Sequence, residues 1–286
     1  MAIGLACLIA LMLVIRSGYE PGARVSGSIL LLLLPATLYF SANRFDVVPA
    51  LFVALGLACL GRDRVVASGL LLGVATMVKV YPALAAPFVV RYLIVNRRRA
   101  FTWVGAFGSV MLVIGAWTVT TNGWEAALAP YRVQLGRPLD AFTFYGYLLP
   151  TGWGANSPAA SAFRTGVVLL VLAVLAWSRP TDLTSVLRRS AIVLIVFVSL
   201  QVFYSPQWVV WLAPFLVPLA SKDRSVLWLV IAWDVVTYLT FPVAFDLRAG
   251  DLMTALVYAR AAVVAALVLT LVRAELHEDG RAVIRR

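Results

Sequence analysis

Eleven apolar runs, separated by short polar or basic stretches, follow one another along almost the whole chain. They cover residues 1–15, 27–41, 47–60, 65–78, 82–95, 102–120, 165–177, 190–204, 208–220, 226–241 and 252–272. Several are shorter than the roughly twenty residues that a helix needs to cross a bilayer, and such short segments are tolerated only inside a bundle or beside a cavity. The pattern predicts an all-α fold, a polytopic transmembrane helical bundle of about eleven segments. We expect it to form one integral membrane domain over residues 1–286.

The apolar stretch 65–95 is interrupted near its middle by Lys79-Val80-Tyr81-Pro82. A lysine among so many apolar residues is costly in a bilayer, so such a charge marks a functional site or a water-filled pocket by default. We therefore expect either that the helix breaks at Lys79 or that the lysine is paired.

Composition places the chain among integral membrane proteins. Of its 286 residues, 62% are hydrophobic and 13% are charged, whereas soluble domains carry about 25% charged residues. Cys7 and Cys59 lie inside apolar runs, and the single histidine, His277, lies in the polar C-terminal tail. These positions exclude a disulfide framework, a thiolate metal site and catalysis by histidine. The net charge of +11 comes from residues scattered between apolar runs, so membrane topology explains it better than nucleic-acid binding.

If successive apolar segments cross the membrane in alternating directions, the basic residues are divided unequally between its two sides. One side receives most of them, including Arg97-Arg98-Arg99 and the tail 273–286. The other side receives Arg44, Lys79, Arg132, Arg137, Arg164 and Arg248. Since cytoplasmic loops carry an excess of Lys and Arg, we expect a multi-pass plasma-membrane protein with a cytoplasmic C-terminal tail and Met1 outside. Residues 1–15 lack a basic n-region, so we do not interpret them as a signal peptide.

One long outer loop is expected over residues 121–164, because no helical or strand period is visible there. Its aromatic residues include Trp124, Tyr131, Phe142, Phe144, Tyr145, Tyr147 and Trp153. Such aromatic density argues against disorder. The rings suit either an interfacial belt or a lid over an acceptor site, and long loops without secondary structure are often functional.

Two sequence blocks carry a family resemblance. The first comprises Asn43-Arg44-Phe45-Asp46, the small-residue stretch 67–73, the Lys79-Val80-Tyr81-Pro82 element and the arginine cluster 97–99. The second is the segment 204–214, with the sequence Tyr-Ser-Pro-Gln-Trp-Val-Val-Trp-Leu-Ala-Pro. Together they resemble the polyprenyl-phosphate-mannose-dependent mannosyltransferases of the GT-C superfamily. The actinobacterial α-(1→2)-mannosyltransferases, of the glycosyltransferase family 87 type, are the most similar branch, and Lys-x-Tyr-Pro is similar to an element of GPI mannosyltransferase I.

The resemblance implies transfer of a hexose, mannose above all, from a polyprenyl-phosphate donor to a glycolipid or glycan acceptor at the outer membrane face. It implies inversion at the anomeric carbon without a metal or other cofactor. It also places a catalytic aspartate in the first outer loop, after a first span; this chain shows no matching loop, so we expect that span and its base to be missing. Two other functions stay open: a transporter or flippase of lipid-linked sugars, and a non-catalytic subunit.

Cations for the leaving phosphate are expected on the outer side. Lys79 is the first candidate, with Arg44 and Arg164 on the same side of the membrane. A lysine ammonium group would act on the phosphate as a point charge, whereas an arginine guanidinium group would donate two parallel hydrogen bonds to it. The alternative is that Lys79 extends to the interface beside Tyr81 without contacting a ligand.

Asp46 is the one outer carboxylate that lies within a family-like motif, so it is the candidate catalytic base. It also suits a structural role, since an aspartate in a tight turn commonly caps the following helix through its side chain or acts as a salt-bridge partner.

Gln207, Trp208 and Tyr81 are the candidate sugar- or lipid-binding residues. Gln207 would bind a sugar hydroxyl, and Trp208 would pack on the sugar ring or the prenyl chain. The alternative is a rigid turn at Ser205-Pro206-Gln207 with interfacial tryptophans, since Trp208 and Trp211 lie about one helical turn apart.

Asp234 and Arg260 lie roughly 12 Å deep in consecutive antiparallel segments, counted at about 1.5 Å per residue. Neither charge would be stable alone at that depth, so we predict a structural ion pair between them.

No P-loop, no Gly-x-Gly-x-x-Gly after a strand and no Asp-x-Asp pair occurs in the sequence. A lipid-phosphate donor fits this pattern, because no nucleotide has to be held. The expected partners are therefore membrane lipid, the donor and the acceptor, with no nucleic acid.

Overall fold

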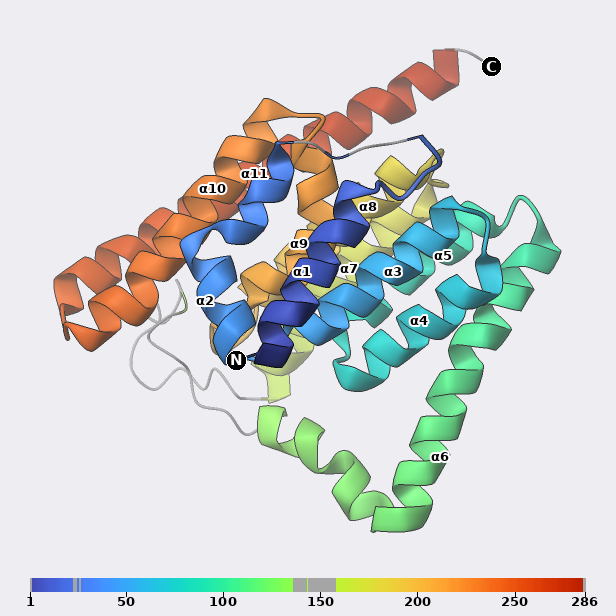
Figure 1. Cartoon of the computed structure of the whole chain (residues 1–286), viewed down its shortest axis with the longest axis horizontal. Helices are drawn as coiled ribbons and strands as arrows, with labels where there is room; N and C mark the ends of the chain where they lie inside the picture. Colours follow the sequence, from blue (N-terminus) through green and yellow to red (C-terminus); the bar gives the residue numbers. More distant parts are fainter. Residues whose placement is uncertain (1, 23–24, 26, 136–142, 144–157, 285–286) are drawn as a thin grey trace.

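The computed structural model describes residues 2–22, 25, 27–135, 143 and 158–284, and every regular element in these residues is helical (Figure 1). The elements are α1 (Ala2–Arg16), η1 (Ser28–Leu33), α2 (Pro35–Asn43), α3 (Val47–Gly61), α4 (Val65–Val78), η2 (Tyr81–Ala85), α5 (Ala86–Leu93), α6 (Arg97–Leu135), α7 (Pro158–Trp177), α8 (Leu183–Ser199), α9 (Trp208–Ala220), α10 (Arg224–Tyr238), η4 (Leu239–Ala244) and α11 (Gly250–Ile284). Each apolar run of the sequence falls on one or two of these elements. The predicted all-α helical bundle is confirmed.

Fewer helices are long enough to cross a membrane than there are apolar runs in the sequence. Within the described ranges, four are long and apolar enough to cross a membrane: α6, α7, α10 with η4, and α11. The pair α2 and α3 would make a fifth if it is one broken span, bent by 108°. Helices α1, α4 and α9 are apolar but shorter. Helix α9 packs inside the bundle, as expected for a segment that cannot span alone, whereas α1 buries only Leu8, Leu11 and Ile15.

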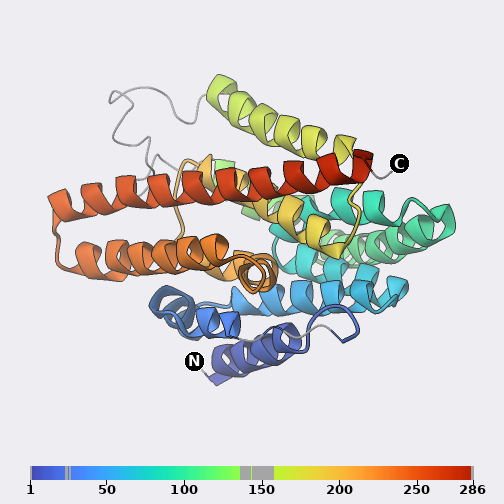
Figure 2. The ribbon, with the colours of Figure 1, turned by 90° about the horizontal axis from the view of Figure 1, so that it is seen from above.

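Helix α9 is the core of the molecule, and all of its residues are buried. Each of its two prolines leaves one carbonyl without its helical donor, and Pro218 has no N–H to offer the carbonyl of Pro214. The hydroxyl of Tyr19 donates to that carbonyl oxygen at 2.8 Å. The connection after α1 is thereby fixed to the central helix. Figure 2 shows α10 and α11 as an antiparallel pair, with α11 farther than α10 from α1.

The small residues of α4 allow close approach of α6. A Cβ atom at Gly69 would lie 2.7 Å from the carbonyl oxygen of Trp103, and one at Gly73 would lie 3.0 Å from that of Phe107. The indole N–H of Trp103 also donates to the hydroxyl of Ser68 at 3.1 Å. Small residues bring helix backbones together in membranes, so this stretch of α4 serves helix packing.

The expected outer loop 121–164 is wrong at both ends, because helix α6 continues to Leu135 and α7 begins at Pro158. Helix α6 is bent at Gly123, whose φ of 79° and ψ of 167° are not helical, and the second arm turns back in Figure 1. Trp124 and Tyr131 lie exposed on that arm. Phe142, Phe144, Tyr145, Tyr147 and Trp153 of the expected loop lie outside the described residues, as does Arg137.

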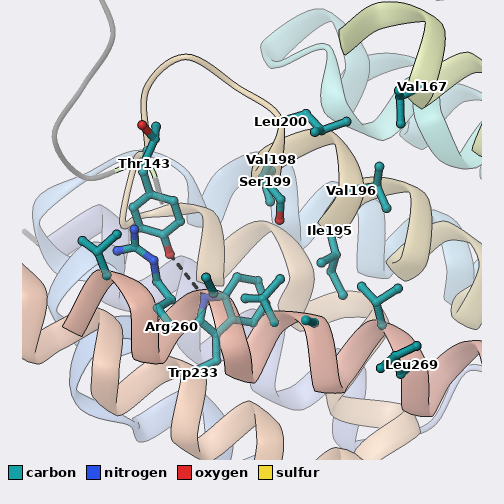
Figure 3. A pocket seen from close by; sticks show the side chains of 16 residues that line it. Thr143, Val167, Ile195, Val196, Val198, Ser199, Leu200, Trp233, Arg260 and Leu269 are labelled. Atoms are coloured by element: carbon teal, nitrogen blue, oxygen red, sulfur yellow. Dashed lines mark hydrogen bonds between the residues drawn. The ribbon is translucent and has the colours of Figure 1, made fainter. Parts of the chain in front are cut away.

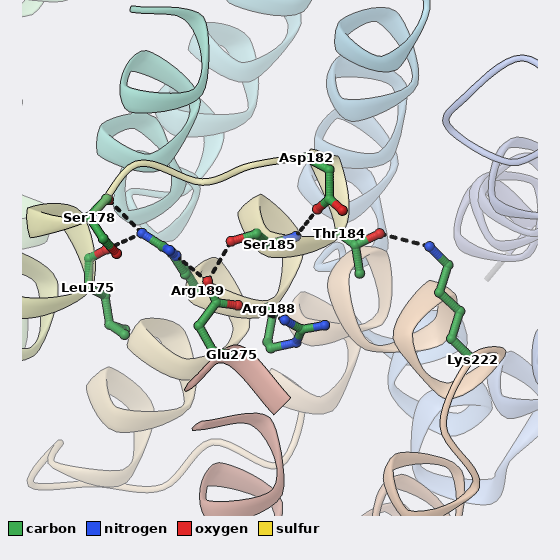
Figure 4. Close-up of polar contacts among 9 residues, drawn as sticks. All are labelled: Leu175, Ser178, Asp182, Thr184, Ser185, Arg188, Arg189, Lys222 and Glu275. Atoms are coloured by element: carbon green, nitrogen blue, oxygen red, sulfur yellow. Dashed lines mark hydrogen bonds and ion pairs between the residues drawn. The ribbon is translucent and has the colours of Figure 1, made fainter. Parts of the chain in front are cut away.

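A buried polar cluster holds α11 against α8 at the end of the bundle that carries Lys222 (Figure 4). The carboxylate of Glu275 accepts hydrogen bonds from Arg188 Nη1 at 2.7 Å, Arg189 Nε at 2.5 Å and the hydroxyl of Ser185 at 2.5 Å. Both arginines precede the apolar run 190–204, but α8 begins earlier, at Leu183, and buries them. The pairing with Glu275 explains how they are tolerated there.

Candidate functional site

The helix break predicted at Lys79 is present, and the lysine is also paired. Helix α4 ends at Val78, Lys79 is extended with φ −151° and ψ 138°, and η2 begins at Tyr81. Pro82 explains the break, since it has no N–H to donate to the carbonyl of Val78 and restricts the residue before it. The break presents the lysine side chain at the end of α4.

Asp46 is the partner of this lysine. It lies at the sharp bend between α2 and α3 and occupies the N-cap position of α3, but its side chain makes no capping hydrogen bond. Instead its Oδ1 atom lies 2.6 Å from Lys79 Nζ and also accepts a hydrogen bond from the indole N–H of Trp211. The alternative that Asp46 is a helix cap is therefore wrong in this structure.

Aromatic rings surround the lysine. Its Nζ atom lies 4.7 Å from the ring centre of Phe45 and 5.0 Å from that of Trp211. The ring of Tyr81 stacks on the indole of Trp211. Their centroids lie 4.4 Å apart, with an interplanar angle of 7°. These cation–π and stacking contacts stabilise the ammonium group in one place.

The two partners differ in accessibility. The side chain of Lys79 is 19% exposed, whereas that of Asp46 is 1% exposed. A ligand arriving from outside therefore meets the lysine before the carboxylate. Two polar atoms of the site, Asp46 Oδ2 and the hydroxyl of Tyr81, are buried without a hydrogen-bond partner among the described residues. Buried polar atoms are normally satisfied, so both are suited to bind a water molecule or a ligand group.

The three predicted sugar- or lipid-binding residues have different surroundings. Tyr81 and Trp208 are buried, at 3% and 2% exposure, so their rings are packed into the protein core and are not open platforms for a sugar. Trp208 lies among Phe203, Tyr204 and Trp211. Gln207 precedes α9 in the predicted turn and is half-buried, so it alone of the three is partly accessible.

The predicted cations do not gather around one point. Arg44 is exposed beside Phe45, whereas Arg164 lies on α7 and hydrogen-bonds to Ser161 of its own helix at 3.1 Å. Among the described residues, the contacts of the Lys79 ammonium group are to Asp46, Phe45 and Trp211. The structure therefore brings together Lys79, Asp46 and Tyr81, and among the described residues Arg164 does not contact Lys79.

The predicted ion pair between Asp234 and Arg260 is wrong. The carboxylate of Asp234 accepts hydrogen bonds from the backbone N–H groups of Ala36 and Thr37 at 2.8 and 2.9 Å and from the Thr37 hydroxyl at 2.6 Å. It therefore caps the N terminus of α2, whose N–H groups have no partner within the helix. The guanidinium carbon of Arg260 lies 3.5 Å from the ring centre of Tyr204.

Trp211 is the site residue that sequence reasoning missed. It was visible as a member of the 204–214 block, but only as an interfacial tryptophan. Its spacing from Trp208 gave no indication that its N–H reaches a carboxylate 165 positions earlier in the chain. No group of three or more His, Cys, Asp or Glu side chains in the described part of the chain could hold a metal ion.

Comparison with known proteins gives one match. The model of glycosyltransferase family 87 matches residues 1–206, which include the α2–α3 bend, Lys79 and the start of the turn before α9. No curated protein and no solved structure matches the chain.

Proposed function

The chain belongs to glycosyltransferase family 87, and from this membership we propose that it transfers a hexose, mannose in the first place, from a polyprenyl-phosphate donor to a glycolipid or glycan acceptor. Its apolar helices and its family make it a membrane glycosyltransferase. We place the reaction at the outer face of the plasma membrane, with the C-terminal tail in the cytoplasm, on the distribution of basic residues.

The observation that carries the donor assignment is the position of Lys79. An ammonium group at a helix break is held by a carboxylate and two rings, and it is still partly exposed. A lipid phosphate that leaves with a negative charge needs a positive group fixed in advance, because a preorganised charge stabilises the transition state without rearrangement. Lys79 meets that need.

In the proposed reaction an acceptor hydroxyl attacks the anomeric carbon, and the bond from that carbon to the phosphate oxygen breaks. The phosphate leaves with the bonding electrons, and the hydroxyl proton passes to a base. Lys79 would offset the charge on the departing phosphate.

Asp46 has two oxygen atoms in different situations. Oδ1 holds Lys79 and Trp211, and Oδ2 has no hydrogen-bond partner among the described residues. The geometry supports Asp46 first as the residue that positions Lys79. Its Oδ2 atom is also the one carboxylate oxygen at this site that is available to take a proton.

A transfer assay tests the proposal. Membranes that contain the chain are supplied with radiolabelled polyprenyl-phosphate mannose and native lipid, and labelled lipid product is measured. Lys79→Met should abolish transfer, whereas Lys79→Arg should retain part of it because the charge remains. Lys222→Met is the matched control, since Lys222 is the only other lysine of the chain and lies exposed at a different site. A folded Lys79→Met protein with unchanged turnover would refute the role of Lys79.

The identity of the sugar is tested in the same membranes. Polyprenyl-phosphate glucose is offered beside polyprenyl-phosphate mannose at equal concentration. We expect product from the mannose donor in excess. Product from glucose alone would overturn the choice of mannose but leave the lipid-phosphate donor in place.

A further inference from the structure

Helix α6 has two arms, and the second one carries an open apolar face. The second arm, residues 124–135, follows the bend at Gly123 and turns away from the axis of the first arm (Figure 1). Trp124, Leu128 and Tyr131 succeed one another at spacings of four and three residues, so their side chains share one side of the helix. They are 68%, 41% and 53% exposed. Three large apolar side chains thus lie together without a cover.

The other sides of the second arm carry small or charged residues. Ala126 and Ala129 lie opposite the apolar face and are exposed. Glu125 and Arg132, both exposed, form an ion pair along one flank, in which Arg132 Nη2 lies 3.2 Å from Glu125 Oε1. Val133 also lies on the alanine side, so the apolar residues taken together show no clear period. The large apolar side chains nevertheless distinguish one face of the arm.

The first arm fixes the depth at which the second arm begins. Helix α6 is long and apolar enough to cross a membrane, and it starts at the basic group 97–99. A helix crosses the hydrocarbon core in about twenty residues, so with these charges at one boundary the other boundary falls close to Val119. Gly123 follows about 6 Å farther along the helix axis. Each headgroup layer is roughly 5–8 Å thick, so the second arm begins inside that layer.

The side chains before the bend fit this boundary. The hydroxyls of Thr118, Thr120 and Thr121 donate to backbone carbonyls four positions earlier, at 2.8, 2.8 and 2.7 Å. Hydroxyls that are satisfied within their own helix need no water, so they are tolerated at the edge of the hydrocarbon core. Trp117 is 69% exposed in the same stretch, and tryptophan is enriched at membrane interfaces. Asn122, whose amide is polar, directly precedes the bend.

The apolar face of the second arm differs from the apolar cavity between α8 and α11. In Figure 3 that cavity is lined by side chains from several elements, among them Ile195 of α8 and Leu269 of α11. The protein itself therefore supplies more than one wall of the cavity. The three large side chains of the second arm project from a single helix at the edge of the bundle (Figure 1). A flat apolar layer can cover all three at once.

We propose that the second arm of α6 lies in the headgroup layer of the bilayer, on the side opposite residues 97–99, with Trp124, Leu128 and Tyr131 inserted toward the hydrocarbon core. Helices of this kind insert their apolar face by about 5–10 Å. Tryptophan and tyrosine suit that depth, because each ring has an apolar body and a polar group that stays hydrated. The ion-paired side chains remain on the aqueous side. The partner of this surface is the lipid layer itself.

Spin-label accessibility of the full-length chain in nanodiscs tests the proposal. Cys7 and Cys59 are replaced by alanine, and one nitroxide is attached at a time. The four labelling variants, two on the apolar face and two on the opposite side, are Leu128→Cys, Tyr131→Cys, Ala126→Cys and Ala129→Cys. Power saturation compares collisions with oxygen, which concentrates in hydrocarbon, and with a nickel chelate, which stays in water. We expect oxygen to dominate on the apolar face and the nickel chelate to dominate on the alanine side.

A matched pair of lysine substitutions separates insertion from folding. Leu128→Lys places a charge on the inserted face, so the nickel-chelate accessibility of a label at position 131 should rise to the value measured at position 126. Ala129→Lys adds the same charge on the aqueous side and should leave the label at position 131 unchanged. Gel filtration and circular dichroism identify the variants that are folded.

Two results would overturn the proposal. Equal accessibility at all four positions of the folded protein would show that the second arm lies in water. Low accessibility to both reagents at positions 128 and 131 would show that protein, such as a second copy of the chain, covers the apolar face. Because no sugar transfer is measured, the result does not depend on the proposed function.

Discussion

The ammonium group of Lys79 lies 2.6 Å from Asp46 Oδ1, although 33 positions separate the two residues in the chain. The contact joins the bend between α2 and α3 to the break after α4. The ion pair therefore links two interruptions of the helical chain. This direct contact makes the pair suitable for a double-mutant cycle.

Removal of either partner alone should destabilise the protein more than removal of both. Lys79→Met leaves a buried carboxylate without its counter-ion, which costs about 3 kcal/mol, and Asp46→Asn leaves the ammonium group without its counter-ion. The double variant should recover part of that loss. The free energy of unfolding is measured by SDS titration in mixed micelles. Strictly additive losses would show that the two residues are energetically independent.

Trp211→Phe should separate the stacking of this side chain on Tyr81 from its hydrogen bond to Asp46. Phenylalanine can still stack on Tyr81, but it cannot donate to Asp46. A hydrogen bond to a charged group is worth about 1.5–3 kcal/mol, so we expect a loss of unfolding free energy in that range and reduced transfer. Trp208→Phe is the control, because Trp208 packs in the same cluster without bonding to Asp46. Equal effects of the two substitutions would mean that ring volume, and not the N–H group, matters.

Asp234→Asn should loosen the N terminus of α2. The carboxylate accepts three hydrogen bonds, and an asparagine offers one carbonyl oxygen and an N–H₂ group that faces other donors. We expect a loss of about 1–3 kcal/mol in unfolding free energy. Asp251→Asn, an exposed carboxylate near the start of α11, should change little. Unchanged stability of Asp234→Asn would argue that α2 is held by its apolar contacts alone.

Gly69→Ala should disturb the packing of α4 on α6. The new methyl group would meet the carbonyl oxygen of Trp103 at 2.7 Å, and a backbone atom cannot move aside without shifting the helix. Overpacking of this kind costs about 1–3 kcal/mol. Gly105→Ala on α6 meets nothing within 4 Å and should be neutral or slightly stabilising, since alanine favours a helix. Thermal unfolding followed by size-exclusion chromatography compares the two, and a reversed order would contradict the close contact.

The sequence predicted correctly those structural features that depend on residues close together in the chain. The eleven apolar runs predicted the helices because burial in lipid or in a bundle requires a continuous apolar segment with internal hydrogen bonds. The break at Lys79 was predictable because Pro82 restricts the chain around it. The extension of α6 beyond residue 121 was missed because its exposed second arm shows no clear periodic pattern of apolar residues.

By itself, then, the sequence determined that this protein is a helical membrane protein, that its fourth helix breaks beside a lysine, and that its motifs resemble a family of glycosyltransferases. Only the tertiary structure decided which groups the buried charged side chains contact. Asp46 binds Lys79 and Trp211 instead of capping its helix, and Asp234 caps α2 instead of pairing with Arg260. The physical reason is that helix formation depends on neighbours in the chain, whereas a buried charge selects its partner among all groups that packing brings within hydrogen-bonding distance.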